Sequence, residues 1–388
     1  MDLPAPVTRV LLSRWFGALG IAVLTVLLGL FGYRMWKRMY DSSRELNISC
    51  FAFRDVNRNG RYDLGDRPYA GLEIVMTRPN GSTVSMSSNI SGFTNFAMSA
   101  RSLGAAVRSE GDHRIEIQPP PGWMLTSAEK QQVRRFRRLA GSPSGLVVEP
   151  TFNPVGVAPR LTVSGQVEPG ATLMIEGPTG SAQPVPVAGD GSFSCETVRG
   201  AWTLTQTLRS GHRIVRRVEV ADYPVVVSRP VELEQPPALS HRHRVDFDTL
   251  TQSDTLYEVP GGYGQLNWVN WVATHQKLYA GPGYINGTVS GEYLAYNSSG
   301  HPARIESERP FDVEGFYLGV AWPNAEKHEI VVRAWRGDQL VHDDRVRGSV
   351  HGPLWFASDY RSITRIEVAS SAFWQVVMDD FSYRLGTP

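Results

Sequence analysis

The sequence predicts a mainly β protein in which one N-terminal transmembrane helix is followed by three β-sandwich modules. Residues 15–33 contain no charged side chain, whereas the rest of the chain shows short alternating apolar segments separated by turns. The 37 glycines and 26 prolines mark these turns, and repeated turn signals favour β-sandwiches over helical bundles. We place the anchor at 1–45 and the modules at 46–157, 158–235 and 240–388.

The uncharged segment Trp15–Tyr33 is long enough to cross a bilayer. At about 1.5 Å per residue its nineteen residues span roughly 28 Å, close to the hydrocarbon thickness of a membrane. Arginine, lysine and interfacial aromatic residues flank both ends. A cleaved signal peptide is the alternative, but Tyr33–Arg38 lacks the small residues of a cleavage site. We therefore expect an uncleaved signal anchor.

One face of the expected helix carries small residues at helical spacing. Small side chains let a second helix approach closely in lipid, where packing drives association. The bland alternative is that glycine and alanine are common in membrane helices. We favour a partner helix packed against this stripe, which consists of Ala18, Ala22, Thr25, Gly29 and Gly32.

Segment 55–66 (DVNRNGRYDLGD) carries the most specific chemical pattern in the chain. Oxygen-bearing side chains stand at loop positions 1, 3, 5, 9 and 12, and glycine stands at position 6. This spacing predicts an EF-hand-type calcium loop. A metal-free surface turn is the alternative. The expected ligands are Asp55, Asn57, Asn59, the Arg61 carbonyl, Asp63 and Asp66, where the short Asp66 and two neutral asparagines imply modest affinity.

The first module shows several short motifs in order, namely the calcium loop, segments 70–74, 91–96 and 115–117, and Pro121–Trp123. With these motifs it resembles the Cna B-type and SdrD B-like domains of bacterial surface proteins. It implies a small, often calcium-stiffened β-sandwich. The basic run Lys130–Arg138 follows, and it is either a surface for anionic lipid or an acidic protein, or simply a solvated face.

The second module resembles a bacterial immunoglobulin-like repeat, on the strand pattern of 161–167 and the turns at 168–170 and 189–191. Such repeats are usually spacers. Four prolines then predict a stiff boundary, at Pro224, Pro230, Pro236 and Pro237. The chain has two cysteines, Cys50 and Cys195, which fall in different modules and are expected to be free thiols.

The third module is aromatic-rich, and its eight or so strand patterns fit a jelly roll. Segments 245–248, 261–268, 283–287 and 378–381 resemble lectin-like domains of secreted PEP-CTERM-type proteins. That resemblance implies a carbohydrate-binding type of sandwich, in which Asp248 and Asp380 could share a calcium. The aromatic side chains could stack on sugars or contact proteins. They are Tyr263, Trp268, Trp271, Tyr279, Tyr284, Tyr293, Tyr296, Phe316, Tyr317 and Trp322.

No catalytic motif is present: HExxH, GxSxG, a P-loop and CxxC are all missing. His241 and His243 are close in sequence but lack a third ligand nearby. We therefore expect no enzyme and no bound cofactor other than structural calcium. The net charge of +1 also argues against nucleic-acid binding.

Two functions remain after these exclusions. The first is a structural accessory subunit of a larger bacterial membrane complex, with its head in the periplasm because its resembled relatives are exported. The combination of one span with β-modules resembles an accessory subunit of a photosynthetic reaction centre–light-harvesting complex of gemmatimonad type. The alternative is a membrane-tethered lectin or adhesin that binds carbohydrate.

Overall fold

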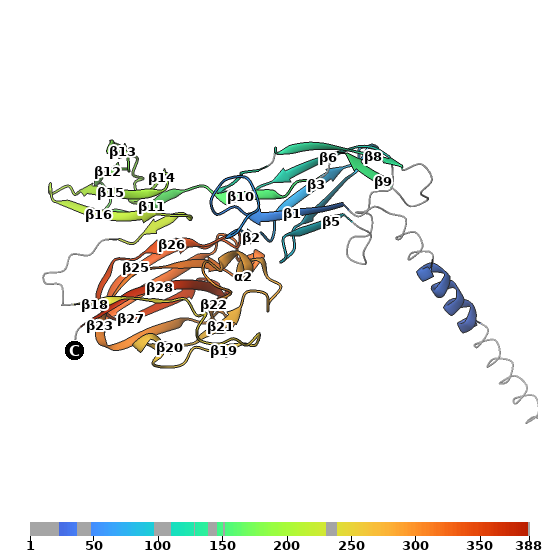
Figure 1. Cartoon of the computed structure of the whole chain (residues 1–388). Helices are drawn as coiled ribbons and strands as arrows, with labels where there is room; N and C mark the ends of the chain where they lie inside the picture. The colour runs from blue at the N-terminus through green and yellow to red at the C-terminus, as the bar shows by residue number, and fades with distance from the viewer. Residues whose placement is uncertain are drawn as a thin grey trace, which may run out of the picture.

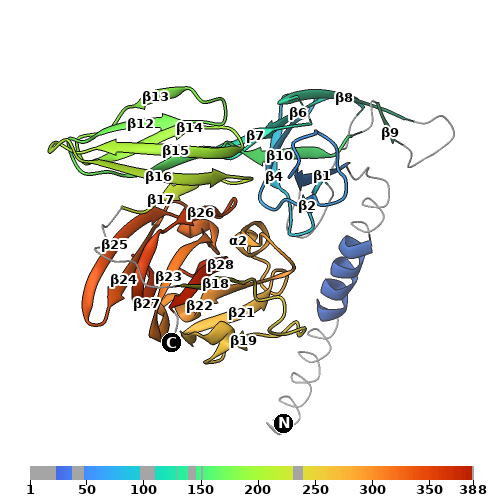
Figure 2. The same ribbon diagram turned by 60° about the vertical axis from the view of Figure 1, so that its left-hand side comes forward.

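The computed structural model describes residues 23–36, 48–96, 110–127, 129–138, 146–149, 152–229 and 239–386. Residues 23–36 form a helix that stands apart from a β-rich head in Figure 1 and Figure 2. The described part of the head contains strands β1 to β28, one short α-helix and three 3-10 turns. The prediction of a mainly β, sandwich-like protein is confirmed.

The predicted membrane span lies only partly within the described residues. Residues 15–22, and with them Ala18 and Ala22, fall outside. All residues of helix 23–36 are exposed. None of the helices in the described part of the chain is both long and apolar enough to cross a membrane.

The first module packs two five-stranded sheets against each other. One sheet has the order β2-β1-β10-β7 with β5 paired to β1, and the other has the order β4-β3-β6-β8-β9. Period-two alternation builds the core, because His113, Ile115 and Ile117 of β6 are buried and alternate with exposed or half-buried neighbours. The strands are β1 (Ile48–Arg54), β2 (Arg67–Pro68), β3 (Glu73–Thr77), β4 (Thr83–Ser87), β5 (Phe93–Phe96), β6 (Gly111–Gln118), β7 (Trp123–Leu125), β8 (Gln131–Arg138), β9 (Leu146–Glu149) and β10 (Val155–Pro159).

The second module has a four-stranded sheet of order β13-β12-β15-β16, and strands β14, β11 and β17 lie in the sheet that continues into the third module. Its core includes Leu173, Phe193, Trp202 and Leu204. The strands are β11 (Thr162–Gln166), β12 (Thr172–Glu176), β13 (Ala182–Val185), β14 (Ser192–Glu196), β15 (Gly200–Thr207), β16 (Arg213–Val220) and β17 (Val225–Val227).

The third module is organised around β23, which spans eighteen residues. Its first half pairs with β20 and β27 and its second half with β28 and β26, with register shifts between Glu306 and Phe311. The elements are β18 (Leu239–Val245), β19 (Tyr257–Glu258), η1 (Tyr263–Gln265), β20 (Asn267–Val269), β21 (Trp271–His275), α2 (Pro282–Gly287), β22 (Tyr293–Asn297), η2 (Ser298–Gly300), β23 (Ala303–Val320), η3 (Pro323–Ala325), β24 (Glu329–Arg336), β25 (Gln339–Arg347), β26 (Leu354–Ala357), β27 (Tyr360–Ser370) and β28 (Val376–Gly386).

The second and third modules share one continuous sheet. Strand β17 pairs in parallel with β26, with Val226 opposite Phe356. The half-buried Arg216 side chain donates to the carbonyls of Ser228 (2.6 Å) and Ala357. Of the four prolines expected to mark a boundary, only Pro224 lies in the described residues, and its carbonyl accepts the Trp355 N–H at 2.9 Å. The second module is therefore joined to the third through one sheet.

The first and third modules are joined by buried hydrogen bonds. The Arg54 guanidinium donates to the carbonyls of Asn286 (3.1 Å) and Thr288 (3.0 Å). The Asn286 side chain in turn donates to the Ala70 carbonyl (2.8 Å) and accepts the Ala70 N–H (3.2 Å). These contacts hold α2 of the third module against β1 and the segment after β2.

Candidate functional site

The predicted calcium loop connects β1 to β2 at one edge of the first module. Asp55 directly follows β1, and Asp66 directly precedes β2. The Asp55 side chain is buried, and its two oxygens accept the backbone N–H groups of Asn59 (3.2 Å) and Gly60 (2.8 Å). These bonds wrap the first half of the loop around one carboxylate.

Gly60 is required where the loop turns. Its φ is +76°, a region that side-chain-bearing residues rarely adopt. A Cβ on this residue would also lie 2.8 Å from the Thr126 carbonyl oxygen. The expected sharp turn at position 6 is therefore present in the structure.

Asp66 closes the loop from its other end. Its Oδ1 accepts the Val56 N–H (2.9 Å) and its Oδ2 accepts the Asp63 N–H (3.0 Å). Burial raises the pKa of Asp66, and the charges of Asp55 and Asp63 raise it further, against the lowering effect of the two backbone hydrogen bonds. Carboxylates from three loop positions thus influence one another, an arrangement that a cation would relieve.

The two asparagines lie between these carboxylates. Their side-chain amides donate to Asp63, Asn57 at 3.1 Å and Asn59 at 2.6 Å, and their oxygens accept backbone N–H groups of the loop. Turning either amide about its terminal bond would present its oxygen to the same side as Asp63. Arg61 is exposed and would contribute its carbonyl. The donor set therefore fits a hard, oxygen-preferring cation such as calcium.

Carboxylates alone do not form this candidate site. Among the described residues there is no cluster of three or more histidine, cysteine, aspartate or glutamate side chains that could hold a metal. Calcium in the loop would depend on Asn57, Asn59 and the Arg61 carbonyl as well as on the three aspartates. Calcium binding stays a prediction.

The loop also lies at the junction of the first two modules. Arg199, between β14 and β15, donates to the Val56 carbonyl in the loop. Arg58 of the loop donates to the Pro159 carbonyl at 2.6 Å. The conformation of the loop is thereby tied to the contact between the modules.

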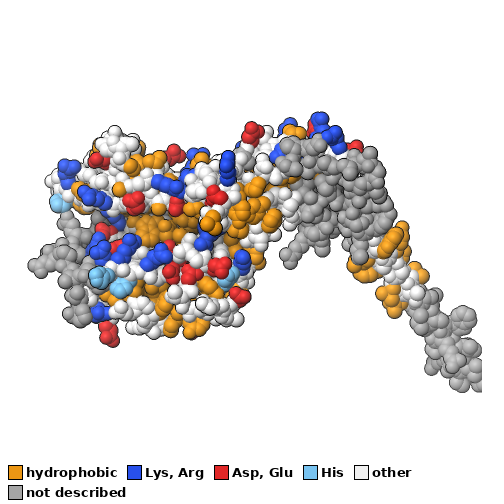
Figure 3. All heavy atoms as spheres, in the orientation of Figure 1, with side chains coloured by type: hydrophobic (Ala, Val, Ile, Leu, Met, Phe, Trp, Pro, Cys, Tyr) orange, Lys and Arg blue, Asp and Glu red, His pale blue; other side chains and the backbone are white. Residues whose placement is uncertain are grey.

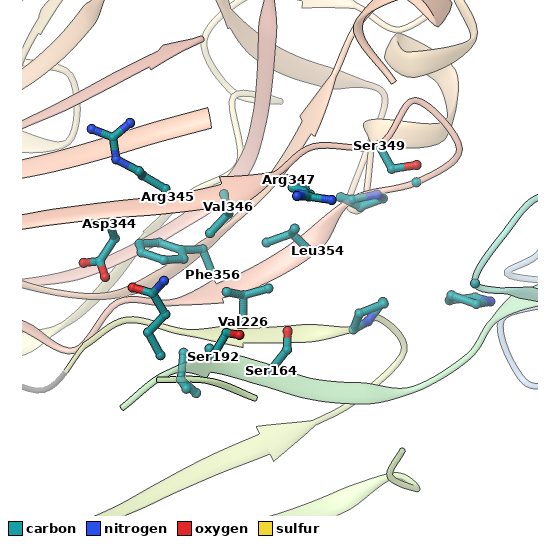
Figure 4. Close-up of a pocket in the computed structure, with 18 of the residues that line it drawn as sticks. Ser164, Ser192, Val226, Asp344, Arg345, Val346, Arg347, Ser349, Leu354 and Phe356 are labelled. Carbon is teal, nitrogen blue, oxygen red and sulfur yellow. The ribbon is translucent and has the colours of Figure 1, made fainter. Parts of the chain in front are cut away.

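A groove of about 420 Å³ lies where the three modules meet. Figure 4 shows Val226, Leu354 and Phe356 between β25 on one side and Ser164 and Ser192 on the other. In Figure 3 hydrophobic side chains gather in the band between the second and third modules, with charged side chains around them. The volume of the groove is within the range of small-molecule binding sites. The polar lining residues are Ser164, Gln166, Ser192, Asp344, Arg345, Arg347 and Ser349.

A histidine stacks on a tyrosine that is hydrogen-bonded to a residue of this groove. The His342 ring lies 4.0 Å from the Tyr360 ring, and the Tyr360 hydroxyl donates to the groove residue Asp344 at 2.7 Å. Burial, and to a smaller extent the charge of Arg336, lowers the pKa of His342 to about 4. The folded protein therefore holds this ring neutral.

We expect His342 to make the head less stable in acid. Its ordinary pKa is 6.5, so the unfolded chain binds the proton first, and stability falls between pH 6.5 and about 4. The loss amounts to about 3 kcal/mol. Replacing His342 by Phe keeps the ring contact and should remove this part of the pH dependence. Urea unfolding at several pH values measures the difference, and parallel curves for both proteins would contradict the assignment.

The basic run does not form one surface. Strand β8 alternates, so Arg134 points inward with its guanidinium 4.8 Å from the Phe152 ring centre. Arg135 pairs with Asp112 (2.6 Å), and Lys130 lies 3.9 Å from Glu116. Anionic lipid or an acidic protein would therefore meet a partly neutralised face, and this contact stays a prediction.

Most predicted aromatic contact residues are part of the core. Trp268, Trp271, Tyr284, Tyr293, Tyr296 and Phe316 are buried, and Tyr263, Tyr279, Tyr317 and Trp322 are half-buried. Sequence reasoning missed Phe373, which is 65% exposed and has a φ of +57°. The exposure and the positive φ of Phe373 are properties of the folded chain, and no sequence pattern indicates them.

The two aspartates expected to share a calcium and the two cysteines are also described by the structure. Asp248 accepts the N–H groups of Glu292 (2.7 Å) and Tyr293 (3.2 Å), while Asp380 accepts the Ser290 hydroxyl (2.7 Å). Both carboxylates therefore already accept hydrogen bonds from groups of the protein. Cys50 is buried and Cys195 is half-buried, and both are free thiols.

Comparison with known proteins gives no family. No family model matches the chain, and no curated protein matches it. The TIE protein of Bacillus anthracis is 12% identical over 47% of this chain and 33% of that chain, with a TM-score of 0.21. The chain thus spans about a third of that protein.

Two pilins are matched at similar values. A variant of the shaft pilin SpaA from Lactobacillus rhamnosus GG is 10% identical over 47% of this chain and 97% of that chain, with a TM-score of 0.21. BcpA, the major pilin subunit of Bacillus cereus, is 6% identical over 82% of this chain and 100% of that chain, with a TM-score of 0.19. These scores are too low to assign a function, and the matches give no support to a photosynthetic reaction centre.

Proposed function

We propose that this chain is a non-catalytic structural subunit of a larger bacterial membrane complex, anchored in the cytoplasmic membrane with its β-rich head in the periplasm. The observation that carries the proposal is helix 23–36. Its large apolar side chains are about half or more exposed, and Leu28, for example, is 61% exposed. An apolar helix whose side chains stay exposed among the described residues requires lipid or a partner protein around it.

The head is suited to holding other subunits in place. Strands β17 and β26 join two modules in one sheet, and the Arg54–Asn286 contacts hold the first module against the third. Because these two junctions are fixed, contact surfaces on different modules keep their positions relative to one another. A clamp between subunits requires such rigidity. Structural calcium in the loop at 55–66 would stiffen the remaining junction between the first and second modules.

The small-residue face supports a partner helix. Thr25, Gly29 and Gly32 lie in the described helix, and a Cβ added at either glycine would meet no atom within 4 Å. A second helix can therefore approach the backbone closely along this stripe. Ala18 and Ala22 would extend the same face.

The first test is solubilisation of native membranes in mild detergent, followed by capture of this chain, mass spectrometry and an absorption spectrum. Stoichiometric recovery of an integral membrane complex supports the proposal. Pigment bands would identify that complex as photosynthetic. A chain recovered alone would contradict the subunit function.

Replacing Gly29 and Gly32 by Leu should weaken this recovery at least about tenfold, because bulky side chains hold the helices apart. The matched control places Phe at Leu27 and Leu30, which face away from the stripe at 100° per residue. Quantitative mass spectrometry of the captured complex compares the two variants at equal membrane levels. Equal losses in both would show general damage to the helix and contradict a specific face.

A second candidate function is a membrane-tethered lectin or adhesin. The groove of about 420 Å³ with polar side chains around an apolar floor favours it. A glycan array probed with the full chain in detergent tests it. Specific binding that is lost on replacing Ser164 and Arg347, without recovery of a membrane complex, would favour this alternative.

A further inference from the structure

A second hollow, of about 410 Å³, lies between the first and second modules beside the calcium loop. Three arginines from separate segments line it: Arg58 from the loop, Arg160 from the start of the second module, and Arg199 from the turn between β14 and β15. None of the motifs in the sequence brings these three residues together.

Two of these guanidinium groups are held by neutral backbone carbonyls. Arg58 donates to Pro159 (2.6 Å) and Arg199 donates to Val56. Carbonyls orient a guanidinium without neutralising its charge.

Acidic side chains only partly balance the hollow. Asp222 pairs with Arg199, and Glu196 lies 4.0 Å from Arg160 with both side chains largely exposed. An exposed pair at that distance contributes little. The lining also contains Thr197, whose buried hydroxyl has no hydrogen-bond partner within the described residues. Among the residues that line the hollow, three arginines stand against one glutamate, so positive charge remains for a ligand.

The rest of the lining is aliphatic. Val198 is 61% exposed, Met124 is 37% exposed, and Leu161 lies beside them. The described residues that line this hollow include no aromatic side chain, so they offer no platform for stacking a sugar ring. A lining of guanidinium groups beside aliphatic side chains is complementary to a peptide in which carboxylates alternate with apolar side chains.

We propose that this hollow binds an acidic segment of a partner protein, with carboxylates at Arg160 and Arg199 and an apolar side chain on Val198 and Met124. The inference rests on the proposed function for the existence of a protein partner. It is independent of the membrane helix and of which complex the chain joins. Arg–carboxylate pairing gives the recognition, and Arg58 contributes long-range attraction.

The test is fluorescence anisotropy with the full chain in detergent micelles. The probe is a short fluorescein-labelled peptide of alternating glutamate and leucine, and its glutamine analogue is the neutral control. We expect saturable binding of the acidic probe that weakens as salt is raised. Arg160→Gln and Arg199→Gln should each weaken it about fivefold.

The matched control is Arg217→Gln, an exposed arginine on β16 of the same module outside the hollow. It should leave the affinity unchanged. Arg199 also contacts the calcium loop, so Arg160→Gln, whose guanidinium supports no backbone carbonyl, decides the question if Arg199→Gln lowers the melting temperature.

Equal binding of the glutamine analogue, or equal affinity of Arg160→Gln, would overturn the proposal. Tighter binding of a sulfated oligosaccharide at the same arginines would overturn it in favour of a glycan. Peptide binding without recovery of a membrane complex would contradict the proposed function alone. Recovery of the complex without peptide binding would contradict only the assignment of this hollow.

Discussion

Calcium is expected to raise the melting temperature of the full chain by a few degrees, and Asp55→Asn is expected to abolish this rise. At calcium roughly 100-fold above its Kd, binding to the folded state alone stabilises by about 2.7 kcal/mol. Asp55 is decisive because its buried carboxylate holds both Asn59 and Gly60 in place. Calorimetric scans in calcium and in chelator measure the rise.

A gentler variant separates ligand loss from loop damage. Among the described residues, the side-chain oxygens of Asp63 accept only from the Asn57 and Asn59 amides. Asp63→Asn should therefore leave calcium-free stability within about 0.5 kcal/mol while reducing the calcium response. Asp190→Asn, in an exposed turn of the second module, is the matched control and should keep the full response. If calcium shifts none of these proteins, the loop is a metal-free turn.

Replacing Arg54 by Met is expected to cost about 3 kcal/mol and to divide a single unfolding transition into two. The change leaves the buried carbonyls of Asn286 and Thr288 without their donor, and each such loss costs about 1–3 kcal/mol. It also removes the contact of Arg54 with the Tyr223 ring, 5.5 Å away. Because these bonds join the first and third modules, they couple the unfolding of the two.

Arg114→Met is the matched control. Arg114 is an exposed arginine on β6 of the same module, away from the junction, and its loss should change stability by less than about 0.5 kcal/mol. Calorimetry of the full chain shows whether one or two transitions occur. A single transition in Arg54→Met, with an unchanged midpoint, would contradict the coupling.

Local patterns in the sequence predicted the strands well because each strand carries its own alternation. The segment predicted at 161–167, for example, contains β11 (Thr162–Gln166). The calcium loop is equally local, and the structure gathers its expected side chains on one loop. A basic run, in contrast, misleads when its segment is a strand, because period two sends Arg134 inward and Arg135 outward.

Features that depend on distant partners could not be predicted. Asn286 meets Ala70 across 216 residues, and nothing near either residue indicates the contact. Strand β17 is only three residues long, and its pairing with β26 depends on the placement of two modules. The arginine hollow likewise unites Arg58, Arg160 and Arg199 from separate segments. Such sites follow from tertiary packing, which a single sequence does not encode locally.

The shared sheet has a consequence for biogenesis. Strand β17 is synthesised long before β26, so one of its edges has no partner until Leu354–Ala357 has emerged. An unpaired edge is a template for pairing with another chain, and slow non-local pairing prolongs that exposure. Chains that stall or are cleaved before Leu354 would therefore accumulate with an open edge, and correct assembly of the head depends on the last tenth of the sequence.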